Sequence, residues 1–329
     1  MAHRHRPDKS TNGRSGIPWP LRAGMAALDA VSPALAGRAG ARLFLTPPRH
    51  PPPRREREAL AAAEPFALVH GGLALRGWTL GTGPAVLLVH GWGGRSGQLS
   101  PIAHALADAG CTAVAFDAPA HGRSGGRTTS MVGIASAASA VAGRYRARAA
   151  VGHSVGGAAV AFAVSRGLDL AAAALIAPPR TPVAFVDHLA SSLRLSLGAR
   201  TALERRIVRA VGVTFDGVDV ARCAPAVPPP FLVVHDRDDP EVPLAVGSAV
   251  AEAWRARLDV TSGLGHRRIL RDAAVVSAVV EFVTGRLARC GCGRLAEPGE
   301  TDGEPRCAGC ALAEDLWARG RRRARIAAA

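Results

Sequence analysis

The chain has 329 residues, 48% of them hydrophobic, so it is long and apolar enough for one large domain with appendages. Its formal net charge is +15, but the basic residues are scattered, are not interleaved with aromatic residues and form no nucleic-acid motif, so nucleic acid is not an expected partner. No stretch approaches the roughly 20 apolar residues of a membrane-spanning helix, and prolines and charges interrupt the N-terminal region too often for a signal peptide, so we expect no transmembrane segment and a cytoplasmic location.

Residues 1–60 are predicted to be a basic, proline-rich extension. Its polar start is followed by a helix-like piece from about Leu21 to Phe44. Packing on the main domain and packing on a membrane surface are both open for this piece, because its apolar positions are too rich in alanine to decide. The stretch from Pro47 to Pro53 has too many prolines for a helix or a central strand and is expected to be an extended spacer.

Residues 61–288 are predicted to be the main domain, in which short apolar runs alternate with helical stretches. This alternation predicts an α/β fold with a mostly parallel central sheet and helices on both faces. One long interval breaks the alternation, and we expect it to be a helical lid, at about residues 178–229, with helices near 185–197 and 202–211. The predicted strands lie near residues 67–69, 73–80, 85–89, 112–116, 149–152, 171–176, 231–235 and 258–261. The other predicted helices lie near 99–109, 131–144, 156–165 and 246–255, and one begins at 272.

The motif Gly152-His153-Ser154-Val155-Gly156 stands where an apolar strand ends and a small-residue helix begins. A serine at such a junction sits on a sharp, strained turn, and its neighbours two positions away must be small because other backbone passes close. Ser154 is therefore the predicted nucleophile, and the backbone N–H of Val155 is a predicted donor to a developing oxyanion. The same five-residue pattern also arises by chance in chains rich in glycine, alanine and serine.

Two further loops follow predicted strands. Residues 89–94 (VHGWGG) are rich in glycine, and we expect the backbone N–H of Trp92 to be the second oxyanion donor, while His90 is expected to be structural. The alternative is a plain glycine-rich turn. Residues 116–124 (FDAPAHGRS) contain Asp117 and His121, a tempting acid–base pair, for which we favour a structural role because a better-placed aspartate and histidine exist.

The better-placed aspartate and histidine come late in the chain. Residues 235–243 (HDRDDPEVP) and 263–268 (GLGHRR) each follow a predicted strand. The resulting order is serine, aspartate, histidine, and all three would lie past the carboxyl ends of strands. His266 is predicted to be the base, with a carboxylate holding its ring and stabilising the imidazolium. We choose Asp239 for the carboxylate, with Asp236 and Asp238 as alternatives. The alternative for His266 is a loop or capping histidine.

Taken together, residues 66–288 resemble the α/β-hydrolase superfamily and are similar to its serine esterases and lipase-like members. The matching pieces are residues 90–94, 117–124, 152–157, 239–243 and 265–266. The pattern D-x-x-V-P of that family places the catalytic acid first, which selects Asp239. The resemblance implies the fold much better than the substrate. A serine nucleophile argues against dehalogenase and epoxide-hydrolase members and leaves esterase, lipase, thioesterase, peptidase and cofactor-free perhydrolase open.

The predicted lid carries several arginines and few acids. One hypothesis is an anionic substrate such as an acyl-CoA, and the simpler interpretation is a set of solvated helix faces in an arginine-rich protein. The arginines concerned are Arg180, Arg194, Arg200, Arg205, Arg206 and Arg209.

Residues 289–329 are predicted to be a cysteine-containing tail that ends in a basic helix. Four thiolates on two short turns, Cys290, Cys292, Cys307 and Cys310, suit tetrahedral Zn²⁺, and the tail resembles a small zinc ribbon. The tighter C-x-C half departs from the usual knuckle, and a disulfide or redox pair is the alternative. Such a zinc would be structural, since all four ligand positions are filled, and the tail is suited to contacting a protein partner.

The sequence thus predicts a serine hydrolase that cleaves a small-molecule ester or thioester through an acyl-enzyme, without a catalytic cofactor. The alternative is a catalytically silent hydrolase-fold protein that acts as a binding or scaffold protein through its zinc tail and basic ends. The intact serine, aspartate and histidine set favours the enzyme.

Overall fold

The computed structural model describes residues 17–287, which group into two compact units. The sheet unit comprises residues 45–182 and 211–287, and the helical unit comprises residues 17–44 and 183–210. Each unit is described by itself below.

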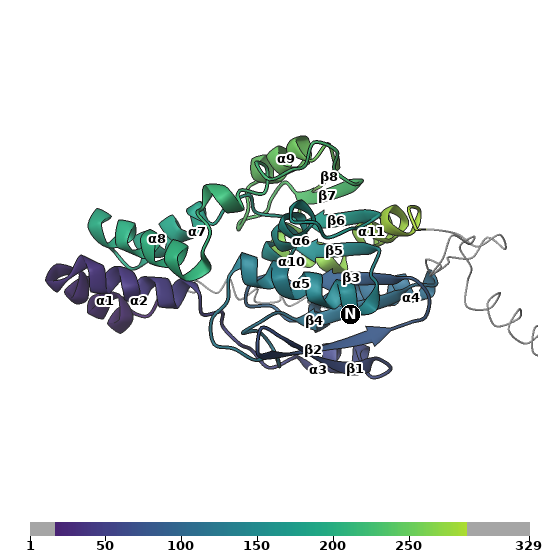
Figure 1. Ribbon diagram of the computed structural model, residues 1–329, viewed down its shortest axis with the longest axis horizontal. Helices are drawn as coiled ribbons and strands as arrows, with labels where there is room; N and C mark the ends of the chain where they lie inside the picture. Colours follow the sequence, from purple (N-terminus) through teal and green to yellow (C-terminus); the bar gives the residue numbers. More distant parts are fainter. Residues whose placement is uncertain (1–16, 288–329) are drawn as a thin grey trace, which may run out of the picture. The chain divides into compact units, whose positions relative to one another are not determined.

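The sheet unit is built on eight strands in the order β1-β2-β4-β3-β5-β6-β7-β8 (Figure 1). The pairs β1–β2 and β2–β4 are antiparallel and all the others are parallel, so the sheet is mostly parallel, as predicted. The strands are β1 (Glu64–His70), β2 (Leu73–Leu80), β3 (Ala85–Val89), β4 (Thr112–Asp117), β5 (Ala149–His153), β6 (Ala172–Ile176), β7 (Phe231–Asp236) and β8 (Arg257–Thr261).

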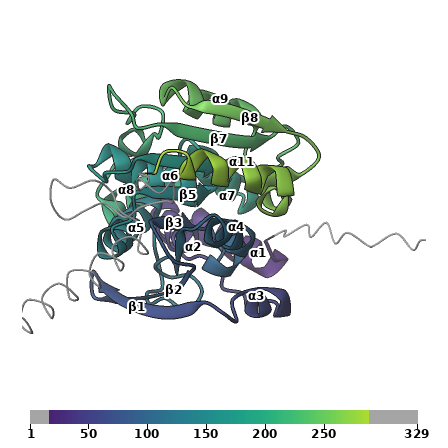
Figure 2. The same ribbon diagram turned by 90° about the vertical axis from the view of Figure 1, so that its right-hand side faces the viewer.

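Helices cover both faces of this sheet (Figure 2). Alternate residues of one strand belong to the two cores: Leu87 of β3 lies in the core that includes residues of α5, α6 and α9, and Leu88 lies in the core that includes residues of α4 and α11. The central strands read as unbroken apolar runs because both of their faces are buried. The helices of this unit are α3 (Arg54–Ala59), α4 (Ser100–Asp108), α5 (Met131–Tyr145), α6 (Val155–Ser165), α9 (Leu244–Ala253), α10 (Gly265–Arg268) and α11 (Ala273–Thr284), with 3-10 turns η1 (Ser96–Leu99), η2 (Asp216–Val218) and η3 (Ile269–Arg271).

The helical unit joins the N-terminal helices to the helices of the predicted lid. It contains α1 (Trp19–Val31), α2 (Pro33–Phe44), α7 (Val183–Ser192) and α8 (Leu197–Val211). Gly37 of α2 allows a close approach to α8, since a Cβ there would lie 2.5 Å from the Cβ of Ala202 and 2.6 Å from the backbone nitrogen of Leu203. Buried Asp29 of α1 accepts hydrogen bonds from the backbone N–H and hydroxyl of Ser196, at 2.5 and 2.8 Å.

The helix-like piece predicted from Leu21 to Phe44 is two helices. α1 ends at Val31 because Ser32 is extended (φ −157°, ψ 102°), the conformation that a following proline, Pro33, favours. No helix in the described part of the chain combines the length and apolar character needed to cross a membrane.

Candidate active site

Ser154 occupies the sharp turn between β5 and α6. Its backbone has a positive φ of 52° with ψ −128°, a conformation that is strained for a residue with a side chain. The turn is fixed from β6, because the Ser154 N–H donates to the carbonyl of Ile176 at 2.8 Å. Ser154 is 9% exposed, at the N-terminus of α6, where the first backbone N–H groups have no partner within the helix.

The glycines two positions before and after Ser154 are required by close backbone. A Cβ at Gly152 would lie 2.6 Å from the carbonyl oxygen of Gly156, and a Cβ at Gly156 would overlap the carbonyl oxygens of Val89 and His90. The crossing of β5, α6 and the end of β3 thus leaves no room for a side chain at either position.

We expect Gly156→Ala to lower the free energy of unfolding by about 1–3 kcal/mol or more, because backbone of β3 must move to admit the methyl group. The matched control is Gly143→Ala in α5, where nothing lies within 4 Å of the added Cβ and the change is expected to stabilise the helix by about 0.5–1 kcal/mol. Urea unfolding of both variants checks this, and equal stabilities would show that the turn tolerates a side chain.

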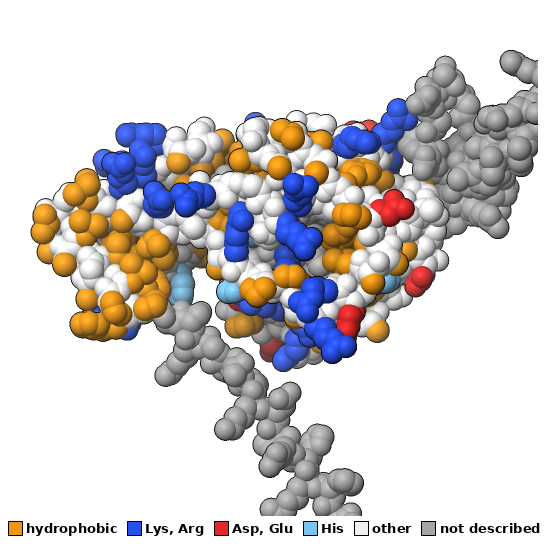
Figure 3. Space-filling view, turned by 90° about the horizontal axis from the view of Figure 1, so that it is seen from below, with side chains coloured by type: hydrophobic (Ala, Val, Ile, Leu, Met, Phe, Trp, Pro, Cys, Tyr) orange, Lys and Arg blue, Asp and Glu red, His pale blue; other side chains and the backbone are white. Residues whose placement is uncertain are grey.

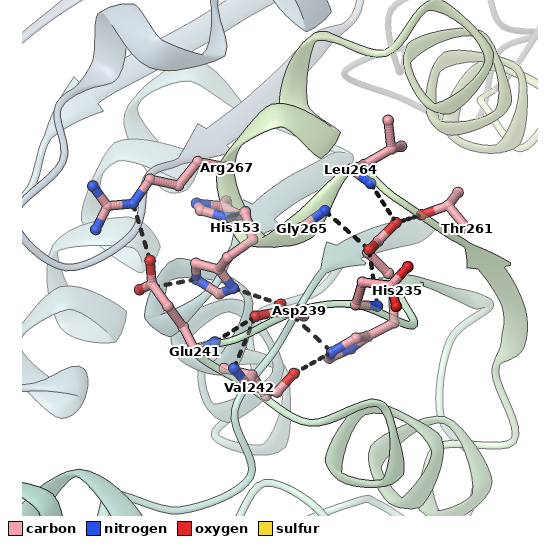
Figure 4. A network of polar contacts seen from close by, with 12 residues as sticks. His153, His235, Asp239, Glu241, Val242, Thr261, Leu264, Gly265 and Arg267 are labelled. Carbon is pink, nitrogen blue, oxygen red and sulfur yellow. Dashed lines mark hydrogen bonds and ion pairs between the residues drawn. The ribbon is translucent and has the colours of Figure 1, made fainter. Parts of the chain in front are cut away.

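His266 and Asp239 are in direct contact. Nδ1 of His266 lies 2.7 Å from Oδ2 of Asp239, and both side chains are buried. The other oxygen, Oδ1, accepts from the backbone N–H groups of Glu241 and Val242 at 2.8 and 2.9 Å (Figure 4). Burial opposes ionisation of Asp239, but these hydrogen bonds outweigh it and lower the pKa of its carboxyl. Because an ionised carboxylate only accepts, Nδ1 of His266 carries a proton, and in the neutral form of the ring this leaves the lone pair on Nε2.

The three competing aspartates have different partners. Asp236 is fully buried and accepts from the hydroxyl of Thr261 and the N–H groups of Leu264 and Gly265, so it holds the loop that carries His266. Burial alone would raise the pKa of Asp236, but its hydrogen bonds outweigh burial, so the pKa is lowered. Asp238 accepts from the N–H of Gly263 at 2.8 Å. Of the three, Asp239 is the one that contacts His266.

The neighbourhood of Ser154 and His266 also contains two residues that sequence reasoning missed. His153 donates from Nε2 to the carbonyl oxygen of His266 at 2.8 Å, and its ring lies 4.8 Å from that of His266. Glu241 places Oε2 3.8 Å from Nε2 of His266 and is paired with Arg267 at 3.1 Å. No hydrogen bond joins the hydroxyl of Ser154 to His266 in the described residues, and such bonds often tighten only when substrate binds.

The glycine-rich loop after β3 is held by two histidines, His90 and His121. His90 donates from Nδ1 to the carbonyl of Gly91 at 2.7 Å and accepts at Nε2 from the N–H of Ala118 at 2.9 Å. His121 accepts at Nε2 from the N–H of Gly93 at 3.0 Å. Burial lowers the pKa of both histidines, that of His121 to about 4, so both are neutral. Within residues 17–287, no hydrogen bond occupies the N–H of Trp92.

Asp117 also holds the loops, through both of its carboxylate oxygens. Its Oδ1 accepts from the N–H and the hydroxyl of Ser96 at 2.9 and 2.8 Å, and its Oδ2 accepts from the N–H of Arg123 at 2.8 Å. Asp117 and His121 therefore order the two loops and do not form an acid–base pair with each other, in agreement with the structural role favoured from sequence.

Residues before β1 also fix these loops, which the sequence did not predict. Glu56 of α3 forms a largely buried ion pair with Arg95, at 2.5 and 2.9 Å, directly after the glycine-rich loop. Arg49, in the expected spacer, donates to the carbonyls of Ala120, Ser124 and Gly126. The spacer thus fixes the loop after β4 and does not only join two parts of the chain.

Two of the arginines predicted to bind an anion are already in ion pairs, and the predicted metal ligands lie outside the described residues. Arg180 is bound by both oxygens of Asp219, and Arg200 is paired with Asp187 and Glu204. The four cysteines of the tail lie outside the described residues, and within residues 17–287 no group of three or more His, Cys, Asp or Glu side chains is arranged to hold a metal.

A family model described as the alpha/beta hydrolase family matches residues 86–279. The chain belongs to the alpha/beta hydrolase family. The match extends from β3 to α11 and includes Ser154, Asp239 and His266. No curated protein sequence matches the chain.

Solved structures of this fold are similar over most of their own length. Est1E of Butyrivibrio proteoclasticus, solved with ferulic acid bound, is 20% identical with a TM-score of 0.56, over 67% of this chain and 98% of that one. An esterase of Pyrococcus furiosus, Pf2001, is 18% identical with a TM-score of 0.56, over 74% and 98%. The thioesterase domain from the curacin biosynthetic pathway is 18% identical with a TM-score of 0.51, over 67% and 99%. These similarities show a shared fold, and the predicted α/β-hydrolase fold class is confirmed.

Acid is expected to destabilise this hydrolase through its buried histidines. The pKa of His121 is lowered to about 4 and that of His153 to about 3 by burial, against 6.5 ordinarily. The unfolded chain therefore binds more protons than the folded one as pH falls below about 6.5, and stability present above that pH is lost progressively toward pH 4, by roughly 3 kcal/mol for each histidine.

Urea unfolding at pH 7, 5.5 and 4.5 measures this loss. The variant His121→Asn keeps a donor and an acceptor but cannot take up a proton in this range, so its stability should fall less steeply with pH than that of the wild type. Parallel pH profiles for the two proteins would contradict the assignment of His121 as a neutral structural residue.

Proposed function

We propose that this chain is a serine hydrolase that cleaves a carboxylic ester or thioester through an acyl-enzyme on Ser154. The observation that carries the proposal is the 2.7 Å contact between His266 and Asp239. His153, the residue before Ser154, bonds to the carbonyl oxygen of His266 and so holds the His266 loop next to the Ser154 turn. Family membership supports a hydrolase in general, and the esterase and thioesterase structures support the ester class of substrate.

In the proposed first half-reaction, Nε2 of His266 takes the hydroxyl proton of Ser154 as Oγ attacks the substrate carbonyl carbon. Asp239 keeps the proton on Nδ1 and stabilises the imidazolium that forms. The tetrahedral intermediate then expels the alcohol or thiol, which receives the proton from Nε2. The products of this half are the free alcohol or thiol and an ester of Ser154.

The second half-reaction repeats these steps with water. Nε2 of His266 takes a proton from water as the water oxygen attacks the carbonyl carbon of the acyl-enzyme. Nε2 then returns this proton to Oγ of Ser154 as the ester bond breaks, which releases the carboxylic acid. In both halves the negative charge on the carbonyl oxygen is proposed to be stabilised by the backbone N–H groups of Val155 and Trp92. The loop contacts of His90 and His121 would hold the second of these donors in place.

A pre-steady-state assay tests the function. Purified protein is mixed with p-nitrophenyl esters of increasing chain length and with acyl-CoA thioesters, and the first turnover is followed together with the intact mass. We expect a burst of leaving group and a mass increase equal to one acyl group. A preference for CoA thioesters over neutral esters would extend the proposal to anionic substrates. Folded protein that gives neither burst nor turnover on the whole panel would favour the silent binding protein instead.

We also propose that the tail cysteines Cys290, Cys292, Cys307 and Cys310 hold a structural Zn²⁺ and have no part in the hydrolysis. Elemental analysis of the purified protein is expected to find one zinc per chain, and the double variant Cys307→Ser/Cys310→Ser should lose it. Cys223→Ser, which changes a free cysteine of the sheet unit, is the control and should keep the metal. Metal-free wild-type protein would contradict the zinc site.

A further inference from the structure

Exposed hydrophobic side chains gather on the helical unit. Ten large hydrophobic side chains are exposed in residues 17–287, and seven of them lie in this unit, which contains about a fifth of these residues. Figure 3 shows hydrophobic side chains gathered over this unit, with basic side chains at their border. A patch of this kind marks an interaction surface. The seven are Trp19, Leu21, Val31, Leu35, Leu43, Phe185 and Leu197.

Helix α1 is apolar on its inner side, where Met25 and Leu28 pack in the core of the unit, and its outer side is uncharged as well. Neither of its two charged residues is exposed. Asp29 is buried and accepts a hydrogen bond from Ser196, and Arg22 is half-buried. Its exposed positions carry no charge at all, and Trp19 and Val31 are 71% and 83% exposed. An ordinary surface helix keeps charged residues outside and apolar ones inside, so the outer face of α1 is suited to an apolar medium. The exposed positions are Trp19, Pro20, Leu21, Ala23, Gly24, Ala27, Ala30 and Val31.

The charge of the helical unit selects the kind of partner. Its described residues include eight arginines and three acids, and the acids are already used: Asp29 by Ser196, and Asp187 and Glu204 by Arg200. Within residues 17–287, no ion pair engages five exposed arginines. A second copy of this unit would bring like charge to like charge, whereas an anionic surface would neutralise them. The five are Arg38, Arg194, Arg205, Arg206 and Arg209.

We propose that the helical unit docks on an anionic phospholipid surface, with the outer face of α1 in the interfacial region and the exposed arginines at the lipid phosphates. Trp19 is suited to this position because its ring is apolar and its indole N–H can bond to headgroups. A helix of 13 residues, about 20 Å long, lies in the plane of an interface and does not cross the bilayer. This inference does not depend on the proposed hydrolysis.

Vesicle sedimentation with the full-length protein tests the proposal. The wild type is expected to bind vesicles of phosphatidylglycerol and phosphatidylcholine in equal parts, to bind pure phosphatidylcholine more weakly, and to be released by salt. The double variant Trp19→Ser/Val31→Ser should bind at least about tenfold more weakly, because two apolar side chains are removed from the interface. The matched control is Val69→Ser/Val227→Ser, which removes side chains that are 74% and 85% exposed in the sheet unit and should bind as the wild type does. Circular dichroism verifies that each variant is folded.

A second variant tests the electrostatic part. Arg205→Gln/Arg206→Gln should weaken binding to the anionic vesicles severalfold and leave binding to phosphatidylcholine unchanged. Three results would overturn the proposal: no binding of the wild type to anionic vesicles, equal binding by the α1 variant and its control, or a dimer in light scattering that the α1 variant converts to a monomer. The last result would assign the surface to a second copy of the chain.

Discussion

Replacing Ser154 by alanine is expected to lower kcat/KM for the best ester or thioester by about a million-fold, down to the residual rate given by binding and oxyanion contacts. The reason is that the alanine variant has no oxygen to attack the substrate, while the fold should be kept. The hydroxyl of Ser154 makes no hydrogen bond in the described residues, so its removal leaves no buried partner unsatisfied. The measurement is single-turnover kinetics on the substrate that the panel identifies.

The control for this variant is Ser191→Ala, at an exposed serine of α7, which should retain full activity and stability. Thermal unfolding of both variants should match that of the wild type. If Ser154→Ala kept more than a few per cent of the activity, the nucleophile would have to be another group, and the proposed acyl-enzyme would be wrong.

Asp239→Asn is expected to lower kcat by about ten thousand-fold with little change in KM. An amide at this position can donate to Nδ1 of His266, which then accepts and carries its proton on Nε2, the atom that must take the proton of Ser154. The amide oxygen can still accept from the N–H groups of Glu241 and Val242, so the loop should keep its shape. The loss therefore measures the tautomer of His266 rather than unfolding.

Asp238→Asn is the matched control, because it makes the same chemical change one residue away. Its carboxylate accepts from the N–H of Gly263, which an amide oxygen can also do, so we expect less than about a threefold change in kcat. Equal losses in the two variants would indicate a general effect of charge near the site. A larger loss in Asp238→Asn would show that the assignment of Asp239 as the catalytic partner of His266 is wrong.

The sheet could be predicted from sequence because each of its central strands is buried on both faces. Runs such as Ala85–Val89 and residues 231–234 are apolar throughout, and glycines, prolines and charges mark their ends. The helix after Ser154 was also predictable, since residues 155–165 carry no charge and no proline. The break at Ser32 was missed because the alanine-rich pattern continues on both sides, although Pro33 was a signal that could have been used.

The contact of His266 with Asp239 was predictable from motif order, because both residues follow strands whose carboxyl ends share one edge of the sheet. The roles of His153 and Glu241 were not. The contact of His153 with the His266 carbonyl spans 113 positions, and no local pattern encodes it. Glu241 lies inside a recognised motif, but its 3.8 Å distance to Nε2 depends on how the loop turns after Pro240.

The helical unit could not be predicted, because it is formed by two segments that are far apart in the sequence. The N-terminal extension and the lid insertion were treated as separate features, yet α1 and α2 pack with α7 and α8 in one core around Met25 and Leu193. Two features join the N-terminal helices to the lid helices. Gly37 has no side chain and so lets α2 approach α8, and buried Asp29 of α1 accepts a hydrogen bond from Ser196. Neither signal can be interpreted until the partner segment is known.

The proposed hydrolysis requires an activated nucleophile at Ser154, and fluorophosphonate labelling tests this requirement directly. The purified protein is treated with the probe, and the modified peptide is mapped by mass spectrometry. We predict one label per chain at Ser154, lost in Ser154→Ala and in His266→Ala and kept in Ser191→Ala. A folded wild-type protein that takes up no label, or that carries it at another residue, would contradict the claim.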